Sequence, residues 1–283
     1  MISIIKRSFL AKRTIILLCA ALFLTGCSGN NQSSSKVSIV GSTSVQPLAQ
    51  TLADEYNANN PQVNIEVQGV GSTAGIKAVY DGTCDIGISS RNLKEEEKAW
   101  NLTETVIALD GIAVIINPNN KIDNLTAEQI LKIFKGEIKN WNELGGDDKE
   151  IIVVSREAGS GTRGAFEELI KLEKKENENS ISLLLDNALI ADGTGSVMAN
   201  VAGKDNAIGY MSIGMVDETK VKKLKLDGID ATEDNVLAQK YNISRPFLMV
   251  SKNDIKNEAK EFLDFIISDE GQKIVSEEYI PVK

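Results

Sequence analysis

One chemical pattern occurs three times along this sequence, each time between an apolar run and a segment with helical spacing. The three stretches are Gly41-Ser42-Thr43-Ser44, Gly69-Val70-Gly71-Ser72-Thr73 and Gly159-Ser160-Gly161-Thr162. Glycine lets a ligand approach the backbone closely, and the first N–H groups of a helix have no acceptor within that helix. Nearby hydroxyls add donors, and a helix N-terminus carries about half a positive charge. The pattern therefore indicates polar groups arranged around an anion.

Arg156, four residues before Ser160, supplies a charged group for the same site. Its planar guanidinium can bind two oxygens of an oxyanion at once. Any one of the three turns taken alone is better explained by a serine or threonine that caps a helix. Three similar turns together with the arginine favour one shared oxyanion site.

Several other chemistries are excluded or weakly supported. The chain of 283 residues contains no histidine, which rules out Ser-His-Asp triads, Cys-His dyads and histidine-dependent zinc or iron sites. We expect neither a metal nor a cofactor. The stretch 69–74 fits the dinucleotide pattern G-x-G-x-x-G/A, but Ser89 and Ser90 stand where that pattern needs an acidic residue. The phosphate-loop motif G-x-x-x-x-G-K-[ST] and the hydrolase motif G-x-S-x-G do not occur.

The charge balance excludes a further class of partner. The chain has 31 basic and 40 acidic residues, a formal charge of −9, and removal of four basic residues near the N-terminus leaves −13. Such an acidic protein is a poor candidate for binding nucleic acid or the surface of an anionic membrane. Local dipoles must therefore hold any anionic ligand against an unfavourable overall field.

Apolar runs and amphipathic segments alternate along the chain, as they do in α/β proteins. The spacing predicts strands at residues 37–40, 63–67, 85–89, 112–116, 151–154 and 247–250. It predicts helices at residues 46–58, 72–80, 127–134, about 162–172, and 259–267. Thr126 and Gln129 form a capping box for the third of these helices, and the charged run 171–178 indicates a solvated end of the fourth. We expect parallel sheets covered by helices on both sides.

Two breaks in the pattern suggest a protein of two lobes. Asn117-Pro118-Asn119 follows a buried strand, and Ser244-Arg245-Pro246 precedes another. These places predict a first lobe of residues 36–116 and 246–283 and a second lobe of residues 117–245. Each lobe is long enough to bury a core of its own.

The N-terminal residues carry an export signal rather than part of the fold. Basic residues within positions 6–13 precede a short apolar run, which is typical of a secretory signal. The run ends at Leu24-Thr25-Gly26-Cys27, which resembles the bacterial lipobox, whose cysteine is lipidated. We expect a signal peptide at residues 1–26 and a lipidated polar tether at residues 27–35, the alternative being an ordinary signal peptide. Cys84 would then be a lone buried thiol.

Six motifs, taken in order, resemble the phosphate-binding protein of bacterial phosphate ABC importers. They are Gly41–Leu48, Gly69–Ile76, Asp85–Leu93, Trp141, Arg156–Thr162 and Ala207–Tyr210. The resemblance covers nearly all of the mature chain. It implies a two-lobed type II periplasmic-binding-protein fold, in which each lobe is a mixed sheet flanked by helices and phosphate binds in the cleft between them. It also implies a non-enzymatic, lipid-anchored extracytoplasmic receptor that delivers phosphate to a membrane permease and its ATPase.

The resemblance assigns roles to residues of the three turns. Backbone N–H groups of Thr43 and Ser44 would bind phosphate, helped by the Thr43 hydroxyl. Ser72 would contribute its N–H and hydroxyl, and Arg156 the charged fork. The helix start of the second lobe would be formed by Ser160, Gly161 and Thr162.

One position departs from the family pattern. Well-known members carry an aspartate that accepts the phosphate proton, whereas this chain has Ser90 there, followed by Arg91. A serine hydroxyl can accept as well as donate, so Ser90 is a candidate for the same role. The alternatives that stay open are a receptor of the same fold for sulfate or another tetrahedral oxyanion, and a secreted enzyme that acts on phosphate esters.

Overall fold

The computed structural model describes residues 35–176 and 179–283. The expected signal peptide, the lipidation site Cys27 and the tether up to residue 34 lie outside the described residues. Ser35, the last residue of the expected tether, is the first residue of strand β1 (Ser35–Gly41). Among the helices in the two described ranges, none is long and apolar enough to cross a membrane.

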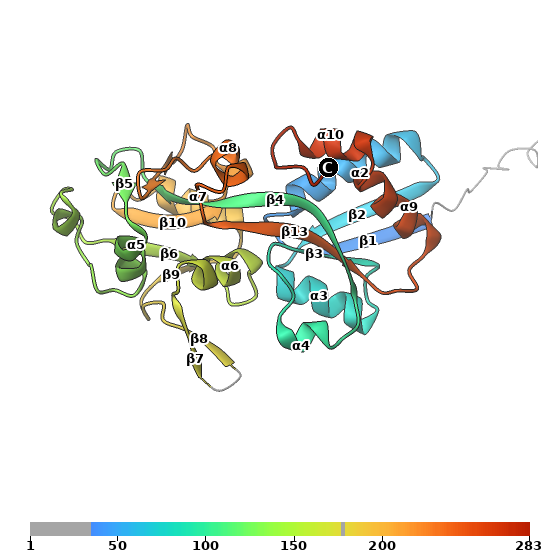
Figure 1. Ribbon diagram of the computed structural model, residues 1–283, viewed down its shortest axis with the longest axis horizontal. Helices are drawn as coiled ribbons and strands as arrows, with labels where there is room; N and C mark the ends of the chain where they lie inside the picture. Colours follow the sequence, from blue (N-terminus) through green and yellow to red (C-terminus); the bar gives the residue numbers. More distant parts are fainter. Residues whose placement is uncertain (1–34, 177–178) are drawn as a thin grey trace, which may run out of the picture. The chain divides into compact units, whose positions relative to one another are not determined.

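The helices and strands fall into three groups, which are those of the first lobe, those of the second lobe and two long strands that connect the lobes. The first group holds β1, α2 (Gln46–Asn59), β2 (Val63–Gly69), α3 (Ser72–Asp81), β3 (Ile86–Ser89), α4 (Glu95–Lys98), α9 (Asn257–Ile266) and α10 (Asp269–Val275). The second holds β5 (Asn124–Leu125), α5 (Ala127–Phe134), η1 (Trp141–Leu144), β6 (Ile152–Arg156), α6 (Gly161–Leu169), β7 (Glu173–Glu176), β8 (Asn179–Ser182), β9 (Leu189–Ala191), α7 (Thr194–Ala202), β10 (Ala207–Ser212), η2 (Ile213–Met215), β11 (Lys222–Lys223), β12 (Lys225–Leu226) and α8 (Glu233–Leu237). Two long strands, β4 (Thr103–Ile116) and β13 (Ser244–Ser251), run from one group to the other (Figure 1).

The main sheet has the strand order β2-β1-β3-β13-β4-β10-β6-β9, with β11 beside β4. β1 pairs in parallel with β2 and β3 at one end, and β6 pairs in parallel with β10 and β9 at the other. β13 and β4 are antiparallel to each other and to the strands they join. The expected parallel pairing therefore occurs within each lobe, and the crossing strands make the sheet mixed, as the resemblance implied.

Each lobe has one large hydrophobic core, and the first lobe has in addition a smaller cluster that includes Ile76 and Leu248. Ile107 and Ala108 of β4 belong to the first core, whereas Ile112 to Ile116 of the same strand belong to the second. On β13, Phe247 packs in the first core, and Ile243, just before the strand, packs in the second. The residues of β4 therefore pass from the first core to the second between Ala108 and Ile112, before the Asn-Pro break that follows residue 116. No turn is needed at this point, because a continuous strand can contribute side chains to two cores.

A buried ion pair joins the two strands where they cross. Arg245 Nη2 lies 2.9 Å from Asp110 Oδ2, and both side chains are almost fully enclosed. Asp110 also accepts a hydrogen bond from the Ser212 hydroxyl at 2.8 Å. Burial raises the pKa of the Asp110 carboxyl and lowers that of the Arg245 guanidinium. The pairing fixes β4 against β13 at the point between the lobes.

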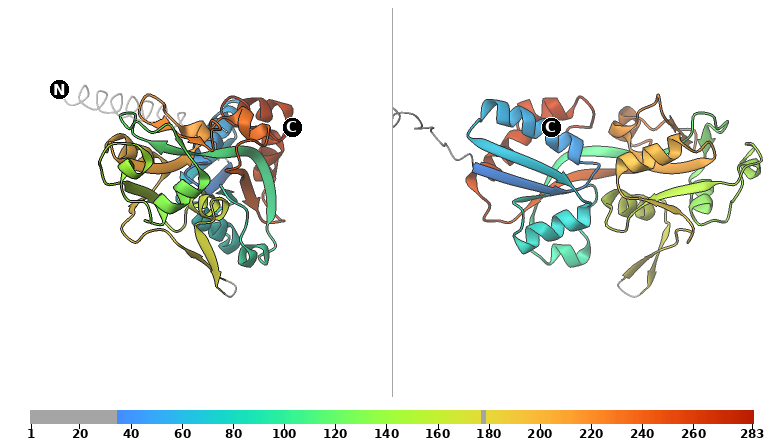
Figure 2. Two further views of the ribbon diagram at one scale, coloured as in Figure 1. Left: turned by 60° about the vertical axis from the view of Figure 1, so that its left-hand side comes forward. Right: turned by 180° about the vertical axis from the view of Figure 1, so that it is seen from behind.

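Helices cover both faces of each half of the sheet. In the first lobe, α2, α9 and α10 lie on one face and α3 on the other (Figures 1 and 2). In the second lobe, Phe166 of α6 stacks on Tyr210 of β10 with ring centroids 3.9 Å apart, while α7 packs over the neighbouring Gly209. Adjacent strand residues point to opposite faces, so α6 and α7 cover opposite sides.

Most of the expected elements are confirmed within about two residues at each end, and the capping box of Thr126 and Gln129 is present. The expected helix to residue 172 ends instead at Leu169, because Lys171 takes a left-handed φ of 60°. Residues Glu173–Glu176 of the charged run form strand β7, which pairs antiparallel with β8, rather than a helix end. The first nine residues of β4 were not expected, although they include the apolar run Val106–Leu109.

Candidate functional site

Sheet register brings the turns of the first lobe together. Gly41 at the end of β1 lies opposite Gly69 of β2 and Ile88 of β3. Because these strands are parallel and end in register, the segments that follow them begin side by side. Ser42, Ser72 and Ser90 are therefore neighbours although they are far apart in the sequence.

The three serines are joined by hydrogen bonds. The Ser42 hydroxyl donates to Ser90 Oγ at 2.8 Å, and the Ser90 backbone N–H donates to Ser72 Oγ at 3.2 Å. The Ser72 and Ser90 hydroxyl oxygens are 3.4 Å apart. Ser42 also accepts from the backbone N–H of Ser44. The sequence-predicted residues Ser44, Ser72 and Ser90 thus share one buried polar surface with Ser42.

Hydroxyls of the second lobe meet this surface. Ser44 Oγ lies 2.8 Å from Thr162 Oγ1 and 2.8 Å from Thr194 Oγ1. Thr162 Oγ1 also lies 3.5 Å from Ser90 Oγ. We define the hydroxyl cluster as Ser42, Thr43, Ser44, Ser72, Ser90, Thr162 and Thr194. It spans the interface between the lobes, and an oxyanion oxygen could replace either partner in these hydroxyl contacts.

Arg156 stands at one end of the hydroxyl cluster and is only 2% exposed. Its Nη2 donates to Thr43 Oγ1 at 3.0 Å, and its Nη1 donates to Thr194 Oγ1 at 3.1 Å. The Nε edge is held by Glu157, with Nε–Oε2 at 2.8 Å and Nη2–Oε1 at 2.7 Å. The fork therefore faces Glu157 on one edge and two threonine hydroxyls on the other.

The hydrogen bonds from Arg156 determine which way the threonine hydroxyl hydrogens point. A guanidinium has donors and no acceptor, so both threonine oxygens must accept from Arg156. Each threonine then keeps its own hydrogen to donate, and Thr194 has Ser44 within reach of it. A donor-only group at one end thus orients the hydroxyls toward the interior, which favours a negatively charged ligand there.

Two glycines allow the lobes to approach this closely. A Cβ on Gly161 would lie 2.3 Å from Ser72 Oγ and 2.7 Å from Ser90 Oγ. Gly71 has a φ of +99°, which side chains rarely adopt, and a Cβ there would lie 3.2 Å from the Gly159 carbonyl. The backbones also touch, since the Thr73 N–H donates to the Gly159 carbonyl at 3.1 Å. The second and third glycine turns therefore pack directly against each other.

Ser160, Gly161 and Thr162 have different roles at the start of α6. Ser160 caps α6, because its hydroxyl accepts from the Arg163 N–H at 3.2 Å and its own N–H donates to the Glu157 carbonyl. Its side chain thus faces its own helix rather than the hydroxyl cluster. Gly161 and Thr162 are the first helical residues, whose N–H groups have no acceptor within a helix.

Arg91 is held in a separate buried ion pair beside Ser90. Its Nη1 and Nη2 donate to the two Glu97 oxygens at 2.7 and 2.8 Å, and Nη2 also reaches Thr73 Oγ1 at 3.1 Å. Burial works to raise the pKa of Glu97, but hydrogen bonds from Arg91 and the Lys94 N–H outweigh it, so the pKa lies below its usual range. Arg91 is thus committed to structure next to the site.

Sequence reasoning missed Thr194 and did not single out Ser42. Thr194 begins α7 directly after β9, within the stretch Gly193-Thr194-Gly195-Ser196. That stretch repeats the pattern of glycine and hydroxyl residues between a strand and a helix. The signal was present, but the short strand before it has only three residues and gives weak periodicity.

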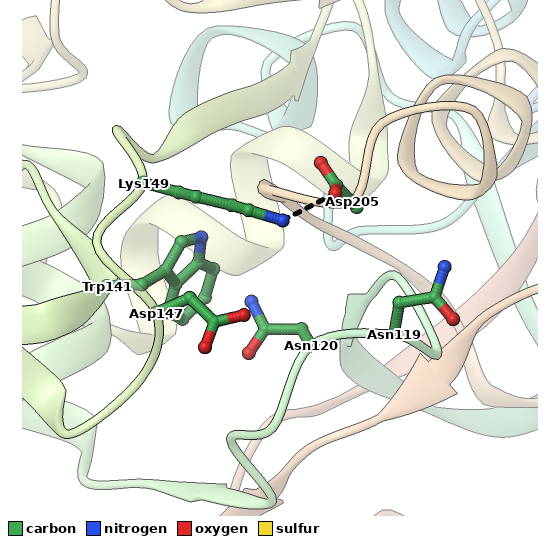
Figure 3. A pocket seen from close by; sticks show the side chains of 6 residues that line it. All are labelled: Asn119, Asn120, Trp141, Asp147, Lys149 and Asp205. Atoms are coloured by element: carbon green, nitrogen blue, oxygen red, sulfur yellow. Dashed lines mark hydrogen bonds and ion pairs between the residues drawn. The ribbon is translucent and has the colours of Figure 1, made fainter.

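Other hollows of the surface lie away from these residues. A small pocket in the second lobe is lined by Asn119, Asn120, Trp141, Asp147, Lys149 and Asp205 (Figure 3). Its wall is tied by a Lys149–Asp205 ion pair at 2.6 Å. A groove of about 500 Å³ runs beside Ile133, Gly136 and Leu184. Neither hollow includes a residue of the hydroxyl cluster.

The described residues offer neither a cluster of metal ligands nor a reactive thiol. Within residues 35–176 and 179–283, no group of three or more acidic or cysteine side chains could hold a metal ion. Cys84 is buried, as expected, and desolvation together with the nearby Asp85 charge raises the pKa of its thiol to about 11. That thiol is therefore protonated and unreactive at neutral pH.

Comparison with known proteins gives consistent relatives. A sequence model of the PBP superfamily domain matches residues 28–270. The phosphate-binding protein PstS of Bacillus subtilis strain 168 is 33% identical over 263 residues, which cover 90% of this chain and 83% of that protein. The phosphate-binding protein PstS of Borreliella burgdorferi is 31% identical over 274 residues, covering 94% and 97%.

Two solved structures are similar in fold and sequence. One, from Clostridium perfringens, is assigned as a phosphate ABC transporter substrate-binding protein and contains bound phosphate. It matches with a TM-score of 0.83 at 47% identity, covering 88% of this chain and 100% of that one. An ABC-type phosphate transport receptor from Vibrio cholerae matches with a TM-score of 0.73 at 39% identity, covering 87% and 100%.

Proposed function

We propose that this chain, which belongs to the PstS family of phosphate-binding proteins within the PBP superfamily, binds inorganic phosphate outside the cytoplasm and delivers it to an ABC importer. Its two-lobed α/β fold is that of periplasmic binding proteins. The ligand would bind between the lobes, among the hydroxyl cluster, Arg156 and the first turn of α6.

The observation that carries the proposal is the placement of Arg156. It lies buried between threonine hydroxyls of two lobes, 3.0 Å from Thr43 and 3.1 Å from Thr194. Micromolar affinity requires about −8 kcal/mol, and a hydrogen bond to a charged group contributes about 1.5–3 kcal/mol. About eight donors from this set can offset desolvation and lobe closure.

The proposed function is that of a receptor and not of an enzyme. A phosphate-ester hydrolase without histidine would need an unusual serine–lysine or aspartate nucleophile. Arg156 and Arg91 are the cations nearest the hydroxyl cluster in its hydrogen-bond network, and both are already paired with carboxylates. This arrangement suits holding an anion rather than activating a nucleophile.

Calorimetry with phosphate, sulfate and p-nitrophenyl phosphate tests the ligand. We expect tight phosphate binding, weaker sulfate binding and no turnover of the ester. Equal or tighter sulfate binding would indicate a receptor for another oxyanion, and release of p-nitrophenol would contradict the receptor proposal. Small-angle scattering should also show a smaller radius of gyration with phosphate than without it, because ligand draws the lobes together.

The anchor and the transport partner belong to the same proposal. The Leu-Thr-Gly-Cys junction supports lipidation at Cys27, which would hold the receptor at the outer surface of the membrane near a permease and its ATPase. Cys27→Ala should release the protein from membranes while leaving phosphate affinity unchanged. If fractionation finds this variant still firmly bound to membranes, lipidation at Cys27 is wrong.

A further inference from the structure

We propose that Thr194 is a further ligand-binding residue of this site, whose hydroxyl donates to the bound oxyanion and holds the lobes closed over it. The inference rests on the proposed phosphate binding and extends it. It adds a fourth glycine–hydroxyl turn, from the start of α7, to the three that the sequence indicated.

Thr194 and Thr43 stand in the same relation to Arg156. One guanidinium nitrogen donates to each of them, at 3.1 and 3.0 Å, and their own oxygens lie 3.2 Å apart. They come from opposite lobes, so Arg156 lies at the centre of a nearly symmetrical clamp. If Thr43 contacts the anion, Thr194 Oγ1 lies close enough to Thr43 Oγ1 to contact the same anion.

The Thr194 hydroxyl hydrogen has two acceptors within reach, Ser44 Oγ at 2.8 Å and Thr43 Oγ1 at 3.2 Å, and both belong to the hydroxyl cluster. The Thr194 oxygen accepts from Arg156, which has no acceptor, so its own hydrogen must serve another partner. Ser44 Oγ, at 2.8 Å, can accept that hydrogen in the closed structure. A negatively charged oxygen is a stronger acceptor than a hydroxyl, and it would therefore take this hydrogen when it binds.

The local backbone supports this role. Thr194 is the first residue of α7, a helix of nine residues, and its side chain is 1% exposed. Its backbone N–H already reaches Thr43 Oγ1 at 3.4 Å across the lobe interface. Two residues later, Ser196 turns its hydroxyl away to Asp192 at 2.7 Å. The helix thus directs one hydroxyl into the site and a second one out of it.

The test compares three variants by phosphate calorimetry and stopped-flow kinetics. Thr194→Val removes the hydroxyl with little change of shape and should weaken phosphate binding about 10- to 100-fold. The loss should appear as faster phosphate dissociation with a nearly unchanged association rate. Thr194→Ser keeps the hydroxyl and should bind within about threefold of the parent. Ser196→Ala, the matched control on the same helix, should bind as the parent does.

The outcomes distinguish a failure of the Thr194 inference from a failure of the proposed phosphate binding. A parent protein that does not bind phosphate contradicts the proposed function itself. A parent that binds phosphate, together with a Thr194→Val variant that binds equally well, overturns the role of Thr194 alone. Loss of binding in both Thr194→Val and Thr194→Ser, with unfolding temperatures like that of the parent, also overturns it, because the hydroxyl is then not what matters.

Discussion

Arg156 Nη2 donates a hydrogen bond to Thr43 Oγ1 at 3.0 Å, joining residues 113 positions apart in the chain. Arg156 ends strand β6 of the second lobe, and Thr43 follows strand β1 of the first. The contact therefore forms only when the lobes meet. Arg156, the charged group of the proposed site, therefore also helps to hold the two lobes together.

Truncation of Arg156 should remove most of the affinity. Arg156→Ala leaves a buried anion without its charged partner, so we expect phosphate binding weaker by about 2–5 kcal/mol in calorimetry. Arg156→Lys keeps the charge but loses the fork that reaches Thr43 and Thr194, and it should fall between the alanine variant and the parent. Normal phosphate binding by Arg156→Ala would mean that the oxyanion site has been misplaced.

Ser90 should control the choice between phosphate and sulfate. Ser42 donates to one lone pair of Ser90 Oγ at 2.8 Å, and the second lone pair, which now has only the longer contacts to Ser72 and Thr162, can accept the proton that phosphate carries and sulfate lacks. Ser90→Ala should therefore weaken phosphate binding by about 1 kcal/mol and spare sulfate binding. Ser90→Asp should sharpen the preference for phosphate.

Competition calorimetry with the two anions measures both Ser90 variants. If both keep the parent's ratio of phosphate to sulfate affinity, discrimination lies elsewhere. Arg91 is then the next residue to substitute, because it follows Ser90 directly and lies 3.1 Å from Thr73.

A side chain at Gly161 should prevent closure. The Cβ of Gly161→Ala would overlap Ser72 Oγ and Ser90 Oγ, and Ser72 Cβ itself lies 3.0 Å away. Overpacking of this kind costs about 1–3 kcal/mol, so phosphate should bind about 10- to 100-fold more weakly. Scattering should show a smaller decrease in radius of gyration on adding phosphate.

Gly195→Ala is the matched control for Gly161→Ala. Gly195 also lies near the start of a second-lobe helix, but a Cβ there has nothing within 4 Å. It should close and bind as the parent does. Full closure of the Gly161→Ala variant would show that the two lobes approach less closely in solution than this interface requires.

The Arg91–Glu97 pair should give the protein an acid-sensitive element. The folded-state pKa of Glu97 is lowered, so its stabilising contribution is fully present above the unfolded-state pKa of about 4.3 and is lost as pH falls through the lower folded-state value. Glu97→Gln leaves Arg91 buried without its partner and should lower the free energy of unfolding at pH 7 by about 3 kcal/mol.

Urea unfolding of the parent and the variant at pH 7 and pH 3 measures this effect. The difference between them should shrink at the lower pH, because below a pH of about 4.3 the unfolded parent takes up the Glu97 proton and the stability that the charged pair contributes falls. Glu95→Gln is the control, since that carboxylate is 89% exposed in the same short helix and should leave the unfolding midpoint nearly unchanged. A Glu97→Gln variant as stable as the parent at pH 7 would contradict the argument.

The sequence by itself determined the local elements and the chemistry of the turns. Strand and helix ends depend on side-chain spacing and capping over a few residues, so α5 with its Thr126 capping box could be predicted from residues 126–134 alone. The glycine–hydroxyl turns and the arginine at position 156 already indicated an oxyanion site, and the absence of histidine excluded histidine-dependent catalysis.

Tertiary structure alone decided which of these groups meet. The register of β1 with β2 and β3 brings Ser42 and Ser90 within 2.8 Å, and the crossing strands bring Thr162 and Thr194 to Ser44 from the other lobe. Local spacing cannot show that Ser160 faces its own helix while Thr194 contacts Ser44 and Arg156, or that Glu157 occupies one edge of Arg156. Such contacts join residues far apart in sequence, and their geometry depends on how two separately packed cores are held against each other.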